Sequence, residues 1–197
     1  MSTYFRQIDH LYHMTLISNL SSILNNGLFS HDEINRRGVH REDISLASVQ
    51  ERRHQRIEPI YNRSIHEYVC LYFSPRNPML FKRRELQNDI VILGLSRDLI
   101  KEKDTIFTDG NAASEDTKFY HGIEELAYLP WGIIKSEYWT DYEDGKRIKC
   151  AETLVYKQID KSAIHRVYCR IPDQYHRVVP ILGAARGIAC VRPRLFF

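Results

Sequence analysis

The stretch over residues 65–81, IHEYVCLYFSPRNPMLF, most constrains how this chain folds. Its middle, residues 68–73, is an unbroken aromatic, aliphatic and thiol run, which is typical of a strand buried on both faces. The run ends at Ser-Pro-Arg-Asn-Pro, and proline cannot continue a strand ladder because it lacks an N–H group. We therefore predict a central strand whose carboxyl end carries a stiff loop with Arg76, a position where α/β folds often bind ligands. From this stretch alone, an ordinary proline turn after a core strand is the slightly favoured interpretation.

Further elements are predicted on both sides of this strand. Residues 11–15 predict a short strand, and residues 16–26 carry a helical stripe that closes at Gly27. Residues 29–48 have little periodicity and much charge, which predicts a long surface loop of the kind that forms lids. Ser48 is expected to cap a helix that projects Arg52, Arg53 and Arg56. More strands are predicted at 89–95, 163–169 and the centre of 148–156, and residues 105–113 predict a short strand followed by a turn at Asp109-Gly110. Together these elements predict an α+β fold around a mixed sheet, as one domain over residues 1–197.

The charge of the chain is unevenly distributed. The net charge is +3, but residues 36–63 carry seven arginines against four acids, and residues 166–197 carry six arginines against one acid. Residues 98–144 carry twelve acids against four lysines. A basic face opposite an acidic one suits a polyanion such as nucleic acid, although a solvated mixed surface explains the charges about equally well.

Composition also limits the cellular context. No apolar run approaches the roughly 20 residues of a membrane span, and the first residues show no signal-peptide pattern, so we expect a cytoplasmic protein without membrane contact. The four cysteines are widely scattered with no CxxC pair, which favours buried thiols over disulfides or a zinc site.

Two side chains stand out as candidates for function. Glu152 is a carboxylate inside an apolar strand, and a buried carboxylate costs several kcal/mol unless it is paired or used. It is either a salt-bridged residue of an edge strand or a group that stabilises a developing cation. His13 alternates with Thr15 on one side of the first predicted strand. A hydrogen-bonded core histidine is the commoner explanation for such a residue.

Taken together, several segments resemble the DarT family, the DNA ADP-ribosyltransferase toxins of bacterial toxin–antitoxin systems. The similar segments run nearly end to end and are YHMT followed by ISNLSSIL, then VQERR, HEYVCLYFSPRNPML, AYLPWGIIKSEYWTD, KRIKCAETLVY and the closing RPRLFF. The resemblance implies an ADP-ribosyltransferase fold in which NAD lies in a cleft between two halves of a split sheet. The lid over residues 29–48 matches only in place, and the ending departs from the family's RPxWYF-like pattern. These departures leave the lid contacts and the preferred base open.

The resemblance also implies roles for individual residues. The catalytic residues would be Glu152 and Arg53, with Arg52 as a one-residue alternative for the assisting arginine. The residues that it places against NAD are His13, Thr15, Tyr12 and Asn19. Those that it places against DNA are Arg76, Asn77, Met79, Trp139 and Arg147. Partners implied by the family are single-stranded DNA, modified on thymidine more readily than on guanosine, and a macrodomain antitoxin that removes ADP-ribose. No metal is implied.

The residue types suit this chemistry. Breaking the nicotinamide–ribose bond builds positive charge on the ribose, and a carboxylate hydrogen-bonded to the 2′-hydroxyl stabilises that charge. A carboxylate can also take the proton of the base nitrogen, and Arg53 would stabilise the deprotonated base. A base inside a duplex cannot present that nitrogen, so single-stranded DNA is expected, with Tyr120, Trp131 or Trp139 as a stacking face.

Three other interpretations remain at this point. The chain is a relative that modifies RNA or a protein, or it is a non-catalytic nucleic-acid-binding module. The second of these leaves Glu152 without an account. A metal-dependent nuclease is the weakest of the three, since the acids of residues 98–144 show no ligand spacing.

Overall fold

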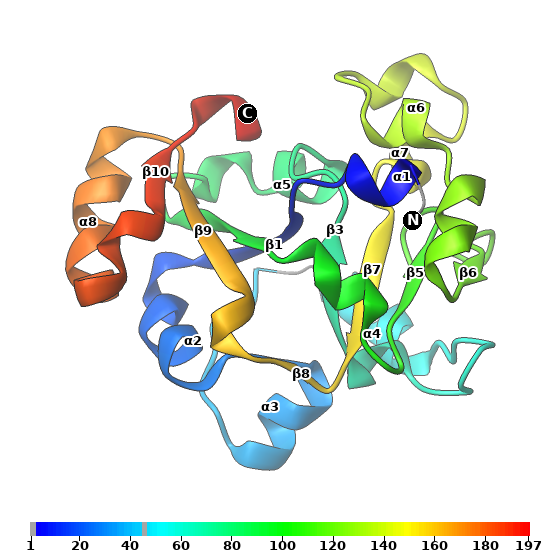
Figure 1. The fold of residues 1–197 in the computed structure, drawn as a ribbon, viewed down its shortest axis with the longest axis horizontal. Coiled ribbons are helices and arrows are strands. Elements are labelled where there is room, and N and C mark those ends of the chain that lie inside the picture. Colours follow the sequence, from blue (N-terminus) through cyan, green and yellow to red (C-terminus); the bar gives the residue numbers. More distant parts are fainter. Residues whose placement is uncertain (1–2, 45–46) are drawn as a thin grey trace.

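A computed structural model describes residues 3–44 and 47–197 of the chain (Figure 1). The strands are β1 (Leu11–Leu16), β2 (Leu28–Phe29), β3 (Tyr68–Tyr72), β4 (Ile90–Leu95), β5 (Ile106–Thr108), β6 (Phe119–Tyr120), β7 (Glu152–Tyr156), β8 (Gln158–Ile159), β9 (Ile164–Cys169) and β10 (Ala189–Val191). The α-helices are α1 (Thr3–Arg6), α2 (Leu20–Asn26), α3 (His31–Arg37), α4 (Ala47–Gln55), α5 (Pro78–Lys82), α6 (Trp131–Ile134), α7 (Gly145–Ile148) and α8 (Pro172–Leu182).

One eight-stranded sheet, in the order β10-β9-β4-β1-β3-β7-β5-β6, organises the molecule. β10 is parallel to β9, and the other neighbouring strands are antiparallel, so the sheet is mixed as predicted. β1 pairs with β4 along its whole length, but within the described residues it pairs with β3 only at Tyr12 and Tyr72. Beyond that pair the two strands diverge. The sheet is therefore split into two halves, and the space between them is available for a ligand.

The central strand is confirmed. β3 lies between β1 and β7, with Val69 and Leu71 in the main hydrophobic core on one face. Its other face carries Tyr68, Cys70 and Tyr72, which pack in two smaller apolar clusters. The strand stops before the Ser-Pro-Arg-Asn-Pro segment, where Asn77 caps α5. The strands predicted at 11–15, 89–95 and 163–169 are likewise present as β1, β4 and β9.

The prediction of a loop over residues 29–48 is wrong for its first part. Residues 31–37 form α3, whose N-terminus is capped by Ser30 through a 3.2 Å hydrogen bond from the Glu33 amide. The Glu33 carboxylate in turn accepts hydrogen bonds from Arg36 and Arg37, one turn further along. This helix has a single aliphatic residue, Ile34, so it shows no hydrophobic period. Local capping and ion pairs stabilise it instead. The predicted loop also covers residues 45–46, which lie outside the described residues.

The remaining differences are small shifts of boundaries and one missed helix. α4 begins at Ala47, one residue before the predicted cap at Ser48. β7 begins only at Glu152, because residues 145–148 form α7 and the chain turns at residues 149–150. The expectations from sequence did not include α8, whose interior Pro180 would ordinarily end a helix. Nevertheless α8 buries Val178 and Leu182 and packs beside α2 (Figure 1). None of the helices within residues 3–44 and 47–197 combines the length and apolar character that a membrane crossing requires.

Candidate active site

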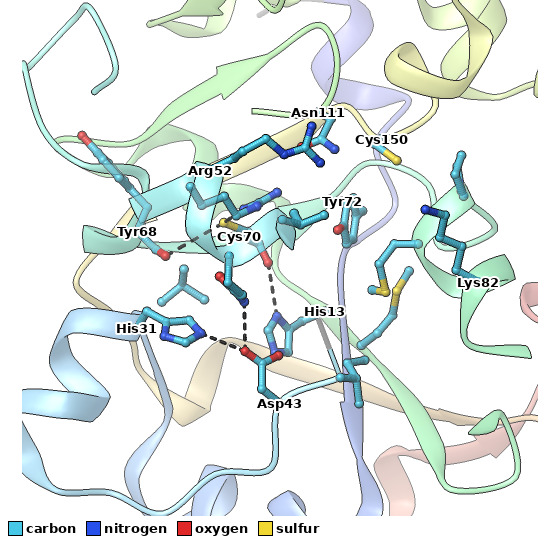
Figure 2. A pocket seen from close by; sticks show the side chains of 18 of the residues that line it. His13, His31, Asp43, Arg52, Tyr68, Cys70, Tyr72, Lys82, Asn111 and Cys150 are labelled. Carbon is cyan, nitrogen blue, oxygen red and sulfur yellow. Dashed lines mark hydrogen bonds and ion pairs between the residues drawn. The ribbon is translucent and has the colours of Figure 1, made fainter. Parts of the chain in front are cut away.

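A cavity of about 430 Å³ lies where β1 and β3 diverge (Figure 2). Strand β1 contributes His13 and Thr15 to its wall, and β3 contributes Cys70 and Tyr72. The segment over residues 41–44 and helix α4 form another wall. Lys82 of α5 also lines the cavity and lies at the right in Figure 2. The cavity thus collects side chains from segments far apart in the sequence. Its volume lies in the range of small-molecule and cofactor sites.

Glu152 is the first residue of β7 and is fully buried. Both of its carboxylate oxygens accept hydrogen bonds from Arg53 Nη2, at 2.7 Å for Oε1 and 2.9 Å for Oε2. Oε1 also accepts a 2.8 Å hydrogen bond from the Ala112 amide. Its own backbone amide donates to Thr108 Oγ1 at 3.2 Å. The carboxylate is therefore salt-bridged, but β7 lies between β3 and β5, so the expected place on an edge strand is wrong. The role of Glu152 in stabilising a developing cation stays a prediction.

Arg53 points into the molecule, in contrast to the projecting position expected from the sequence, and is only 8% exposed. Its Nη1 atom donates to the Cys70 sulfur at 2.7 Å, while Nη2 contacts Glu152. Burial lowers the pKa of Arg53, but the Cys70 sulfur and the Glu152 carboxylate raise it, and the pKa ends well above its ordinary value. Burial raises the pKa of the Cys70 thiol to about 12. The thiol is thus an acceptor for Arg53 and not a reactive nucleophile.

His13 lies on the opposite wall of the cavity from Lys82 and Cys150 (Figure 2). Its Nδ1 atom is 3.2 Å from the Cys70 carbonyl oxygen. Because a carbonyl can only accept, Nδ1 carries the proton and Nε2 is left as an acceptor. Burial, aided by the charge of Arg41, lowers the pKa of His13 to about 4. The imidazole is neutral at physiological pH.

Thr15 and Asn19 connect β1 to the cavity wall at residues 41–44. The Asn19 amide donates to Thr15 Oγ1 at 3.1 Å and to the Glu42 carbonyl at 2.8 Å, and its oxygen accepts from the Glu42 amide at 3.0 Å. Asn19 is buried and does not line the cavity. The structure therefore supports a role for Asn19 in anchoring the wall that Glu42 belongs to.

A further network in this wall was not predicted. Asp43 Oδ2 is 2.8 Å from His31 Nε2 and accepts a 2.9 Å hydrogen bond from the Gln50 amide (Figure 2). Gln50 in turn lies 3.0 Å from His66 Nε2, and the rings of His31 and His66 stack with centroids 4.6 Å apart. These residues join α3, the 41–44 segment and α4 around the cavity. Nothing in the local sequence indicates the network, since its members become neighbours only after folding.

Comparisons with known proteins decide the family. Residues 12–197 match the model of the family described as "ssDNA thymidine ADP-ribosyltransferase, DarT". The chain belongs to the DarT family.

Two relatives illustrate how much of the chain is shared with other DarT-family proteins. A "DNA ADP-ribosyl transferase-DNA ADP-ribosyl glycohydrolase fusion protein" of Thermosipho africanus is 34% identical over 168 residues. That match covers 83% of this chain but 43% of the fusion protein. A "DNA ADP-ribosyl transferase" of Thermus sp. strain 2.9 is 30% identical over 202 residues, which cover 95% of each chain.

The solved structures agree with the family assignment. The structure of Thermus sp. 2.9 DarT in complex with ADP-ribosylated single-stranded DNA has a TM-score of 0.87 at 28% identity and covers 97% of both chains. The same enzyme in complex with NAD+ has a TM-score of 0.83 at 26% identity and covers 97% of this chain and 98% of the other. The α+β fold with a split mixed sheet is thus the fold of DarT ADP-ribosyltransferases, as the sequence resemblance implied.

The structure divides the residues that the DarT resemblance named into two groups. His13, Thr15, Arg53, Met79 and Arg147 line the cavity, and Glu152 lies directly behind Arg53. Tyr12 points elsewhere and packs against Tyr168, with ring centroids 6.3 Å apart. It lines a separate depression on the surface. The predicted contact of Tyr12 with NAD stays a prediction.

Two of the predicted DNA-binding residues are engaged inside the protein. Asn77 is fully buried, accepts a 3.1 Å hydrogen bond from the Leu80 amide and donates to the Ser74 carbonyl. Arg147 pairs with Asp109 at 2.8 Å and with Asp144 at 2.7 Å. Asn77 therefore shapes the turn before α5, and Arg147 braces the loop whose Ala112 amide contacts Glu152. Contact with DNA stays a prediction for both.

Arg76 and Trp139 lie in an aromatic cluster that also contains Phe81 and Phe197. The Arg76 guanidinium carbon is 4.7 Å from the centroid of the Phe197 ring. Trp139 meets Phe81 and Phe197 at centroid distances of 5.9 and 5.7 Å. Trp131, in contrast, is only 9% exposed, and its indole nitrogen donates a hydrogen bond to the Leu126 carbonyl oxygen. Of the three aromatic residues expected as a stacking face, Tyr120, Trp131 and Trp139, the last belongs to this cluster.

The remaining expectations concern cysteines and metals. All four cysteines are free thiols, and Cys150 and Cys169 are buried. In the part of the chain that the structure describes, no three His, Cys, Asp or Glu side chains lie close enough to hold a metal ion.

Proposed function

We propose that this chain transfers ADP-ribose from NAD+ to a thymidine base in single-stranded DNA, with Glu152 and Arg53 as the catalytic residues. The observation that carries the proposal is the buried Glu152–Arg53 pair beside the cavity in the split sheet of a DarT-family chain. The family description names thymidine, which favours this base over guanosine.

His13 and Thr15 would bind NAD+ from the β1 side of the cavity. A neutral His13 with Nε2 as acceptor can hydrogen-bond to a hydroxyl or amide of the dinucleotide without repelling a cation. Cations that line the cavity, such as Arg41, Lys82 and Lys146, provide attraction for the diphosphate. Substrate binding would then orient the nicotinamide ribose toward Glu152.

Glu152 would act during cleavage of the bond between nicotinamide and ribose. Its carboxylate accepts a hydrogen bond from the ribose 2′-hydroxyl and stabilises the positive charge that develops on the sugar. The same carboxylate takes the proton from the thymine nitrogen as that nitrogen attacks the ribose carbon. Arg53, next to Glu152, stabilises the deprotonated base. A base must be unstacked to reach this point, which explains the single-stranded substrate.

The direct test is incubation of the protein with NAD+ and single-stranded oligonucleotides, followed by mass spectrometry. We expect oligonucleotides that contain thymidine to gain the mass of one ADP-ribose. Matched oligonucleotides in which cytidine replaces every thymidine should gain none. Transfer to RNA or to protein alone would contradict the choice of substrate.

We predict that His13→Ala weakens NAD+ binding about tenfold or more, the rough equivalent of one lost hydrogen bond to a ligand with its partner left unpaired. Titration calorimetry with a non-reactive NAD+ analogue measures this. His176→Ala is the matched control, because His176 is exposed on α8. A folded His13→Ala variant with unchanged NAD+ affinity would show that His13 is a core histidine.

We predict that Trp139→Ala lowers affinity for single-stranded oligonucleotides about tenfold, because a stacked base contributes roughly 1–3 kcal/mol. The dependence of affinity on salt should not change, since no phosphate contact is removed. Fluorescence anisotropy at several salt concentrations measures both. Tyr128→Ala is the control, since Tyr128 is 69% exposed and lies in the η5 helix (Ile123–Tyr128), which packs with α1. Equal losses for both variants would remove Trp139 from the DNA site.

The same proposal includes a toxin–antitoxin role in the cytoplasm, with a macrodomain antitoxin that removes ADP-ribose from DNA. The Thermosipho relative supports a glycohydrolase partner, because its name describes a transferase fused to a DNA ADP-ribosyl glycohydrolase. Expression of this chain in bacteria should be toxic, and co-expression of such a glycohydrolase should restore growth. Normal growth with folded protein and unmodified DNA would contradict this role.

A further inference from the structure

Arg53 separates the cavity from the Glu152 carboxylate. Arg53 lines the cavity, whereas Glu152 has no exposed surface. Both carboxylate oxygens accept from Arg53 Nη2, and Oε1 also accepts from the Ala112 amide. A dinucleotide that enters the cavity therefore meets the guanidinium group before it meets the carboxylate.

This arrangement conflicts with the chemistry if it does not change during the reaction. The carboxylate must accept a hydrogen bond from the ribose and oppose a developing positive charge. A guanidinium held against both oxygens neutralises that charge, and together with the Ala112 amide it takes three of the roughly four acceptor sites of the carboxylate. Because Glu152 has no exposed surface behind Arg53, cleavage of NAD+ requires Arg53 to give up at least one of its two hydrogen bonds to Glu152.

We propose that Arg53 is a specificity-determining residue that covers Glu152 until a DNA base draws its guanidinium away, so that ADP-ribose passes to DNA and not to water. This inference rests on the proposed transfer reaction. A thymine base offers carbonyl oxygens, and its nitrogen becomes negative as its proton leaves, so it competes with Glu152 for the Arg53 donors. A water molecule has neither carbonyl oxygens placed to accept from Arg53 nor a nitrogen that becomes negative during the reaction.

The reaction that this cover suppresses is hydrolysis of NAD+. In that reaction the bond between nicotinamide and ribose breaks, and nicotinamide leaves with the bonding electrons. A water oxygen bonds to the ribose carbon and releases a proton, giving ADP-ribose. The reaction needs only NAD+, water and an accessible carboxylate. A carboxylate that is always open to the cavity would therefore consume NAD+ in the absence of DNA.

Cys70 accepts a hydrogen bond from the second terminal nitrogen of Arg53. Arg53 Nη1 donates to the Cys70 sulfur at 2.7 Å, and the Cys70 carbonyl is itself 3.2 Å from His13 Nδ1. The guanidinium is thus fixed by acceptors on β3 and β7, two neighbouring strands of the sheet. Removing the sulfur acceptor weakens the hold on Arg53 while leaving the ion pair with Glu152 in place.

The test measures nicotinamide release at saturating NAD+ without DNA, for the full chain and its variants. Arg53→Met keeps the apolar stem and removes the donors. We expect it to release nicotinamide about 10- to 100-fold faster than wild type, the rate equivalent of one hydrogen bond to a charged group. Cys70→Val should also accelerate release, and Cys70→Ser, which retains an acceptor, should do so less. Calorimetry with the NAD+ analogue and a melting curve check binding and folding.

A folded, NAD+-binding Arg53→Met variant that releases nicotinamide no faster than wild type would overturn the inference. If Arg53→Met does not fold, Cys70→Val decides, and release at or below the wild-type rate overturns the inference in the same way. The proposed function is judged separately, by transfer of ADP-ribose from wild-type protein to thymidine oligonucleotides. A wild-type protein that transfers but shows no faster hydrolysis in either variant keeps the function and loses the role of Arg53 as a cover.

Discussion

Glu152→Gln is expected to reduce ADP-ribose transfer roughly 1,000-fold or more, because it removes both an electrostatic stabiliser of the transition state and a proton acceptor. The amide keeps the size of the side chain but has no negative charge to oppose the ribosyl cation. Interactions made chiefly in the transition state change kcat more than ground-state binding. Binding of single-stranded DNA should therefore persist. Quantitative mass spectrometry of the oligonucleotide product measures transfer, and anisotropy measures binding.

The same variant should also be less stable than wild type. A neutral amide is cheaper to bury than an unpaired carboxylate, but Glu152 is paired with Arg53 at 2.7 Å. Glu152→Gln leaves a buried guanidinium without its anion, and breaking a buried pair in this way costs about 3–5 kcal/mol. Urea denaturation measures the loss. Transfer that stays near wild type in a folded variant would remove Glu152 from the site.

The second large effect concerns the ion pair between Arg53 and Glu152. Arg53→Met should lower the free energy of unfolding by about 3–5 kcal/mol, because Glu152 keeps its buried charge and loses Arg53. The double variant Arg53→Met/Glu152→Gln has neither charge. We expect it to be more stable than the sum of the two single effects predicts by at least about 2 kcal/mol, since contacting residues do not add.

A double-mutant cycle in urea provides this measurement. Arg177→Met and Asp89→Asn form the control cycle, because Arg177 and Asp89 also make a 2.7 Å ion pair but their side chains are about half exposed. That cycle should show a coupling of less than about 1 kcal/mol, as surface pairs usually do. Additive losses at Arg53 and Glu152 would mean that the two groups do not stabilise one another.

Much of the sheet could be predicted from the chain because its strands are local and strongly apolar. β3 and β4 appear as short apolar runs that end at Ser74 and Ser96, and β1 and β9 alternate apolar with polar residues. Glu152 stood out because a carboxylate in such a run is unusual. The resemblance then assigned Glu152, Arg53 and His13 to one site. In the structure His13 and Arg53 line one cavity, and Glu152 lies behind Arg53.

Two helices, α3 and α8, cannot be predicted from hydrophobic periodicity. α3 depends on a cap and on pairs between Glu33 and two arginines, so it has no hydrophobic period. α8 tolerates Pro180 because burial of its apolar side offsets the lost backbone hydrogen bond. These elements follow from packing and capping in the folded protein and not from periodicity.

The family resemblance, the central strand and the residue types of the site can all be recognised in the chain before its fold is known. Which of these side chains lie together depends on how the chain folds. The divergence of β1 from β3 after Tyr12 and Tyr72 creates the cavity, and the inward turn of Arg53 pairs it with a residue ninety-nine positions away. The engagement of Asn77 and Arg147 in internal bonds was decided in the same way. The physical reason is that hydrogen bonds and ion pairs act over a few ångströms in space, while a sequence records only distance along the chain.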